Sequence, residues 1–225
     1  MCQQRKFFTI SSEWMSHSLT VGDNVKRKLP LTIDMLIRLI PNLSENSGLK
    51  AIVLTGFFTF PRKSNLVPPS ATQFEADKHL CRGSFTFNDW GVLIKINWSK
   101  TIQFNERTLY LPIFALECGH ELCPVAALRE HFSEFPSEKD KPAFYYTDKK
   151  GVWLPLTHNS VQSILKNALI NCGINPSNVS CHSWDRGGAD FAHSVAGLDL
   201  PLIQAQGDWA SLSVLCYLIR LYLFK

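Results

Sequence analysis

The residue types best suited to chemistry gather near the carboxyl end of the chain, in residues 181–218. This stretch contains His182, Arg186, Trp209 and Tyr217. An imidazole can transfer protons, a guanidinium can hold an oxyanion, and a tyrosine hydroxyl can act as a nucleophile. A tyrosine on an amphipathic helix is also a common core residue, so the elements around these residues decide between the two interpretations.

Glycine and proline divide the same stretch into predicted helices. Gly187 and Gly188 would let one helix pack closely or let its backbone approach a ligand. Gly197 is typical of a helix stop, and Pro201 fits the first turn of the next helix. Ser211 is positioned to cap a last helix that carries the tyrosine.

A second group of polar residues follows an apolar segment. Residues 49–60 are apolar on nearly all sides, which predicts a buried helix. Arg62 comes directly after it in a Pro-rich turn, where a cation can be held rigidly and still face a groove. Taken alone, a basic residue at a helix end is most often a surface charge that offsets the helix dipole.

The centre of the chain predicts a small antiparallel sheet. Residues 83–87 and 92–98 flank the turn at 88–91, which indicates a hairpin, and a third strand is expected at 108–113. Lys100 lies in the connection before this third strand. A solvated lysine at a sheet edge is a plausible alternative role for it.

Helical periodicity accounts for most of the remaining chain. Ile33, Leu36, Ile37 and Ile40 recur at i, i+3, i+4 and i+7, a pattern of an amphipathic helix that ends at Pro41. Further elements are expected as a helix beginning at 122–128, a short strand within 143–146, and a helix from Thr157 to Gly173 with Val161, Ile164, Leu165, Ala168 and Leu169 on one face. The expected fold class is therefore α+β, mainly helical with a three-stranded antiparallel sheet.

The carboxyl-terminal stretch resembles a box of the tyrosine recombinases, the phage-integrase family, and looks most like those of DIRS-, Ngaro- and Crypton-type mobile elements. That box reads His-x-x-Arg, then Gly-x-His or Gly-x-Trp, then the nucleophilic Tyr, and His182, Trp209 and Tyr217 fill three of its places. Residues 62–68 are similar to the first box of the family, and Lys100 is similar to its β-hairpin lysine.

The resemblance implies cleavage and rejoining of double-stranded DNA through a 3′-phosphotyrosyl intermediate, with no metal and no small-molecule cofactor. Tyr217 would attack, Lys100 would protonate the departing 5′ oxygen, and His182 would orient phosphate or relay a proton. Trp209 would hydrogen-bond or pack beside them. The implied catalytic residues are Arg62, Lys100, His182, Trp209 and Tyr217, and the implied DNA contacts are Arg62, Lys63 and Arg186.

One position departs from the family pattern. The mobile-element version runs His-Ser-Phe-Arg-Arg-Gly-Gly-Ala, whereas residues 182–189 place Asp185 where the second catalytic Arg belongs. Arg186 is one step later, which turns a helical side chain by roughly 100° and directs it elsewhere. A carboxylate repels a dianionic transition state, although it is favourable in the first turn of a helix. We therefore expect impaired cleavage, with a catalytically inactive DNA-binding relic as the alternative.

The whole chain of 225 residues suits one large domain or one domain with a short leader. We expect residues 1–29 to be a linker or the remnant of an amino-terminal helical DNA-clamp domain, and residues 30–225 to be the catalytic domain. The net charge of +4 tolerates a polyanionic partner without requiring one. A generic helical interaction domain with chance motif matches is a third alternative, and it would show no salt-sensitive DNA affinity.

The seven cysteines follow no disulfide framework, which suits a reducing compartment. Cys118, His120 and Cys123 lack the second ligand pair of a structural zinc site, so no metal is expected there. The sequence contains no apolar run of about 18 residues or more, so a membrane span is not expected. A nuclear location is expected for a product of a eukaryotic mobile element and a cytoplasmic one otherwise, with homo-oligomers on DNA as an open expectation.

Overall fold

The computed structural model describes residues 28–99, 102 and 107–209. The predictions made for Lys100, Ser211 and Tyr217, and for most of the leader, therefore lie outside the described residues. The helices and 3-10 turns are α2 (Ile33–Leu39), η1 (Ile40–Leu43), α3 (Ser47–Thr59), α4 (Lys63–Leu66), η2 (Ala71–Gln73), η3 (Arg82–Ser84), α5 (Pro124–Glu134), α6 (His158–Asn171), α7 (Ser183–Ser194) and α8 (Leu200–Gln206). The strands are β1 (Phe85–Asn88), β2 (Gly91–Ile96), β3 (Leu109–Phe114), β4 (Tyr145–Thr147) and β5 (Trp153–Pro155).

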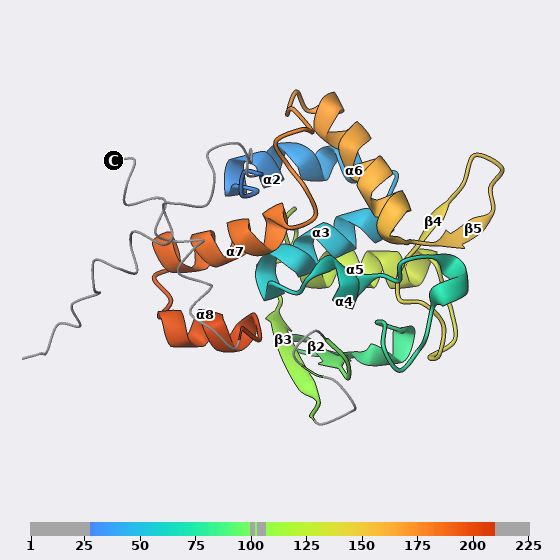
Figure 1. The fold of residues 1–225 in the computed structure, drawn as a ribbon, viewed down its shortest axis with the longest axis horizontal. Helices are drawn as coiled ribbons and strands as arrows, with labels where there is room; N and C mark the ends of the chain where they lie inside the picture. The colour runs from blue at the N-terminus through green and yellow to red at the C-terminus, as the bar shows by residue number, and fades with distance from the viewer. Residues whose placement is uncertain (1–27, 100–101, 103–106, 210–225) are drawn as a thin grey trace, which may run out of the picture.

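Helix α3 is the centre of the fold, as its apolar sequence predicts. Every residue of it is buried except Lys50 and Phe58, and it contacts α5, α6, α7, β3 and β4. Figure 1 shows α3 and α5 through the middle of the molecule, with α7 and α8 together at one end and β2 and β3 beneath. A helix buried on all faces is thus the frame from which the Arg62 segment emerges.

Helix α7 packs closely on α3 through Gly188 and on the segment before α2 through Gly187. A Cβ atom at Gly188 would overlap the carbonyl oxygen of Phe57, and one at Gly187 would overlap that of Leu31. The indole of Trp184, fully buried, covers Gly56 on α3. Of the two roles expected for these glycines, close helix packing is the one observed within the described residues.

The sheet is antiparallel in the order β1-β2-β3, which confirms the predicted three-stranded sheet. Phe85 pairs with Ile94, and Ile94 pairs with Leu111 on the other side. The buried residues of β2 alternate as Val92, Ile94 and Ile96, the period expected of a sheet with one face on the core. The predicted second strand was two residues too long at its end, because β2 stops at Ile96.

The first helix is real, but its predicted buried face was wrong at one position. Ile37 is half-exposed, at 50%. The buried stripe is instead formed by Leu36, Leu39, Ile40 and Leu43, which continue through η1 at the same i, i+3, i+4, i+7 spacing. Pro41 ends the α-helix as expected, but the tighter 3-10 turn keeps the stripe on the core.

Helix boundaries follow the capping residues of the sequence. Thr157 caps α6 with its side chain, Pro201 lies in the first turn of α8, and Gly197 has a positive φ of 68° after α7. Cys123 caps α5, and its sulfur accepts from the Ala126 N–H. In the described part of the chain no cluster of His, Cys, Asp and Glu could hold a metal ion, and no helix there is long and apolar enough to span a membrane.

Candidate functional site

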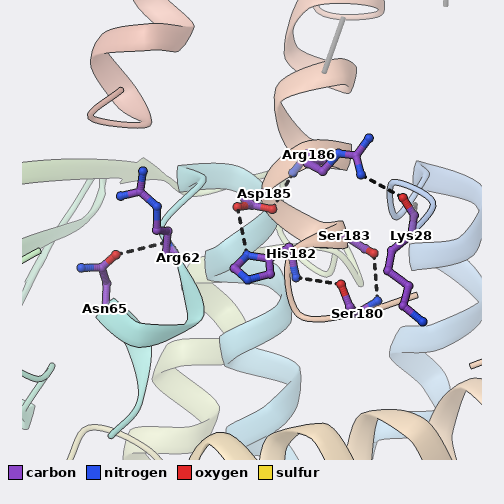
Figure 2. Close-up of polar contacts among 8 residues, drawn as sticks. All are labelled: Lys28, Arg62, Asn65, Ser180, His182, Ser183, Asp185 and Arg186. Carbon is purple, nitrogen blue, oxygen red and sulfur yellow. Dashed lines mark hydrogen bonds and ion pairs between the residues drawn. The ribbon is translucent and has the colours of Figure 1, made fainter. Parts of the chain in front are cut away.

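Arg62 stands at the start of α4, fixed by a neighbouring amide. The Arg62 N–H donates to Asn65 Oδ1 at 3.2 Å (Figure 2). Asn65 Nδ2 in turn donates to the carbonyl of Trp98 at 3.2 Å. Asn65 is buried, so this link between α4 and the end of β2 is protected from solvent. The backbone at Arg62 is therefore held on the sheet while its side chain stays partly exposed.

A small cleft brings three distant segments to Arg62. Its lining includes Asn65 beside Arg62, Ser99 after β2, and Gly207 and Asp208 after α8. Ser99 and Ile102, on either side of residues 100–101, exchange backbone hydrogen bonds of 2.9 and 3.2 Å. The cleft thus places the first-box segment beside the end of the hairpin and the Gly-Asp-Trp segment.

His182 and Asp185 face one another at the start of α7 (Figure 2). His182 Nδ1 lies 4.0 Å from Asp185 Oδ2, which is longer than a hydrogen bond. Asp185 Oδ1 accepts from the Arg186 N–H at 2.8 Å, as a carboxylate in the first helical turn does. The expected helix-start role of Asp185 is therefore present in the structure.

The two side chains have shifted pKa values with identifiable causes. Burial raises the pKa of Asp185 from 3.8 to about 7, although the Arg186 backbone and the charges of Arg186 and Arg62 act in the opposite direction. Partial desolvation by the surrounding segments lowers the pKa of His182, although much of its side chain is exposed, and the charges of Lys63, Arg62 and Arg186 lower it further. At neutral pH the imidazole is therefore neutral and the carboxyl is divided between its protonated and ionised forms.

Arg186 does not share the position of Asp185. Its Nη1 donates to the carbonyl of Lys28 at 2.8 Å, and Figure 2 shows its guanidinium directed toward the Lys28 segment. The direction agrees with the 100° rotation per residue of a helix. The guanidinium thus ties α7 to the segment before α2, while Asp185 occupies the position that faces His182.

Trp209 packs at the end of α8 rather than standing in solvent. Its ring lies parallel to that of Phe60, with centroids 6.0 Å apart, and the two belong to a small core with Ala189, Ala192 and Ile203. Phe60 has a left-handed φ of 58°, a rare conformation for a bulky residue, immediately before the turn to Arg62. The Trp209 segment and the Arg62 segment are therefore joined through an aromatic stack.

An ion pair fixes the turn before Trp209. Asp208 has a φ of 50°, a left-handed value that Asp tolerates better than most residues, and its Oδ1 lies 2.5 Å from Arg107 Nη2. Arg107 comes from the connection that precedes β3. The pair links that connection to the segment carrying Trp209.

The described site unites four of the expected residues, Arg62, His182, Asp185 and Trp209. Sequence reasoning assigned no role to Phe60, Asn65 or Arg107. Asn65 lies within residues 62–68, which resemble the first box, and Asp208 lies within the Gly-Asp-Trp segment. The resemblance could therefore have indicated both residues. Phe60 and Arg107 carried none, because their partners are distant in sequence.

Comparison with protein-family models and with curated proteins gives no match for this sequence. Solved structures are similar. The XerH site-specific recombinase bound to difH substrate, in a pre-cleavage complex, superposes with a TM-score of 0.58 at 17% identity over 88% of this chain and 52% of that one. A lambda integrase dimer bound to a COC′ core site has a TM-score of 0.56 at 14% identity, over 92% of this chain and 52% of that one. The Tn1549 transposon integrase in complex with circular intermediate DNA has a TM-score of 0.56 at 13% identity, over 92% of this chain and 68% of that one.

These likenesses define the class of fold. The chain has the mainly helical α+β fold of the tyrosine recombinase catalytic domain, with its small antiparallel sheet. It spans about half the length of the XerH and lambda integrase chains.

Proposed function

We propose that this chain is the catalytic domain of a DNA-binding tyrosine recombinase of the kind found in DIRS-, Ngaro- and Crypton-type mobile elements. One observation carries the proposal. Arg62 lies in the same region as His182 and the Gly207-Asp208-Trp209 segment, both far from it in sequence, within a fold shared with recombinases and integrases. A generic helical interaction domain gives no reason for this convergence.

The chemistry of the proposed reaction matches these residue types. In-line attack on a phosphodiester adds negative charge to the nonbridging oxygens, which a fixed cation such as Arg62 stabilises. A neutral His182 can accept or donate a proton at the phosphate. Tyr217 would be the nucleophile and Lys100 the general acid, and the covalent link would conserve the bond energy for rejoining.

Lys100 is proposed to reach the site through the end of the hairpin. The Asn65–Trp98 hydrogen bond holds this end of β2 against α4, and Ser99 and Ile102 bracket the lysine in the sequence. Trp209 would support the site by packing on Phe60, which is the second of its two expected roles.

Cleavage is proposed to be impaired, because Asp185 stands where the family has its second catalytic Arg. In its ionised form the buried carboxylate would repel the phosphate, and in its protonated form it still supplies no cation. This buried carboxyl also favours a second candidate function, in which the chain binds DNA on the same scaffold without cutting it. The two candidates share the partner and differ in the covalent step.

The proposed partner is double-stranded DNA. The proposed assembly on it is a homo-oligomer, because the structurally similar lambda integrase is a dimer bound to a COC′ core site. Residues 1–29 are proposed to be a linker or the remnant of an amino-terminal clamp domain. A nuclear location is proposed for a product of a eukaryotic element.

Duplex binding tests the proposal before any cleavage is required. Binding to a labelled 30-base-pair duplex is measured by fluorescence anisotropy. The logarithm of Kd should rise linearly with the logarithm of the salt concentration. Arg62→Gln should weaken binding, whereas Lys149→Gln should not, because Lys149 is an exposed lysine in the β4–β5 loop. A duplex affinity that changes neither with salt concentration nor in Arg62→Gln would exclude both candidate functions.

A further inference from the structure

A second cavity shares His182 with the candidate site. It has a volume of about 260 Å³ and lies between α6, α4 and the segment that leads into α7. Its wall includes Ser180, Cys181 and His182 from that segment. The cavity and the region around Arg62 are therefore neighbours across one imidazole.

The rim of this cavity is basic. Lys28, Lys63 and Lys166 line it, and none of the described residues that line it is an Asp or a Glu. The charge of Lys63 acts inside the cavity: it adds to the desolvation that lowers the pKa of His182, and it opposes the burial that raises the pKa of Cys181. Three ammonium groups without a facing carboxylate make this a region of positive potential.

The floor of the cavity is apolar and its wall carries a hydroxyl. Leu165, Leu169 and Val179 are buried beneath the lysines. Ser180 Oγ accepts from the His182 N–H at 3.3 Å, so its own hydroxyl hydrogen can be directed into the cavity. An apolar floor under a cationic rim fits a ligand with one apolar face and one anionic group.

We propose that this cavity binds one deoxyribose phosphate of a DNA strand, beside the phosphate held by Arg62. The sugar would lie on the apolar floor, and the phosphate would meet Lys63 and Lys166, because lysine binds phosphate as a point charge. The inference rests on the proposed function, since it names a further part of the same substrate. A small free phosphate shares this chemistry, and the experiments below separate the two sources.

The first experiment measures duplex affinity by anisotropy over a series of NaCl concentrations. Lys166→Gln should reduce the salt slope by about one and weaken binding by roughly 3- to 10-fold, since one phosphate contact is lost. Lys149→Gln is the matched control with the same change of charge on an exposed loop, and its slope should equal that of the wild type. Equal behaviour of the two variants would overturn the inference.

The second experiment does not depend on DNA. Inorganic phosphate is titrated into the protein while the His182 ring signals are followed by NMR, with His182→Asn used for assignment. Saturable shifts, and a raised His182 pKa, are expected in the wild type and in Lys149→Gln, and weaker ones in Lys166→Gln. Absence of any shift would overturn the cavity as a phosphate site.

The two experiments distinguish the possible failures. If duplex binding depends on Arg62 but not on Lys166, the proposed function stands and the cavity inference is overturned. If phosphate binds in the cavity but the duplex does not bind at all, the assignment to DNA is overturned together with the proposed function.

Discussion

His182 Nδ1 lies 4.0 Å from Asp185 Oδ2, yet the His182 side chain is 69% exposed and that of Asp185 only 4%. The imidazole can therefore meet a ligand, while the carboxyl beneath it is shielded from water. Burial raises the pKa of Asp185 to about 7, so its charge changes near neutral pH. The properties of the site should then depend on pH through a residue that solvent barely reaches.

Asp185 should make the protein less stable as the pH rises. Its pKa in the folded state, about 7, exceeds the ordinary value of 3.8, so between these values only the folded state keeps the proton. The associated loss of stability begins near pH 4 and is complete above pH 7, and it is on the order of 4 kcal/mol at most. Asp185→Asn should remove it, so that urea unfolding shows a more stable variant at pH 8 than the wild type and little difference at pH 4.

The comparison of variant with wild type is needed because His131 titrates in the opposite sense. Burial lowers the pKa of His131 to about 3, so this residue makes the protein less stable as the pH falls below about 6.5. Asp77→Asn, which removes one exposed carboxylate, is the matched control for the change of charge. An identical pH profile for Asp185→Asn and the wild type would contradict the assigned burial of the carboxyl.

Gly188→Ala should disrupt the contact between α7 and α3. The added Cβ would overlap the carbonyl oxygen of Phe57, a backbone atom that cannot rotate away. We expect a loss of about 3 kcal/mol or more in the free energy of unfolding, measured by urea denaturation. Gly151→Ala is the comparison, since Gly151 has a φ of 79° but open space around it, and should lose only about 1 kcal/mol. Equal losses would show that packing at Gly188 has been misjudged.

The Arg107–Asp208 pair should contribute little to stability, because Arg107 is 50% exposed. A double-mutant cycle with Arg107→Gln and Asp208→Asn should give a coupling energy of about 0.2–1 kcal/mol that shrinks in 1 M NaCl. Asn tolerates the left-handed backbone at position 208, so the variant tests the charge and not the turn. A coupling that salt does not change would mean that the pair is not acting as a surface ion pair.

The parts of the fold that follow from local sequence were predictable. Residues 49–60 are apolar on nearly all sides and lie mostly within the buried α3, and the turn at 88–91 joins β1 to β2 as expected. Gly187 and Gly188 indicated close packing, although the sequence did not say whether a helix or a ligand would fill the space. Ile37 was placed on the wrong face because the stripe continues into η1, which the period of a single helix does not include.

The site was predictable in its residues but not in its electrostatics. The pKa of Asp185 depends chiefly on burial and also on the charge of Arg62, and neither follows from the local sequence, whereas the opposing charge of Arg186 comes from the adjacent residue. Arg107 and Asp208 are 101 residues apart, so only the fold shows that they meet. The basic cavity likewise needs α4 and α6 to bring Lys63 and Lys166 together.

The most direct test of the account is covalent adduct formation on nicked suicide duplexes that carry candidate sites, resolved by denaturing electrophoresis. The wild type is compared with Asp185→Arg and with both chains bearing Tyr217→Phe, after circular dichroism has established that each variant is folded. The account predicts a Tyr217-dependent adduct for Asp185→Arg on duplexes that the protein binds, at a rate about 10²-fold or more above that of the wild type. Brisk adduct formation by the wild type, equal to that of Asp185→Arg, would contradict it.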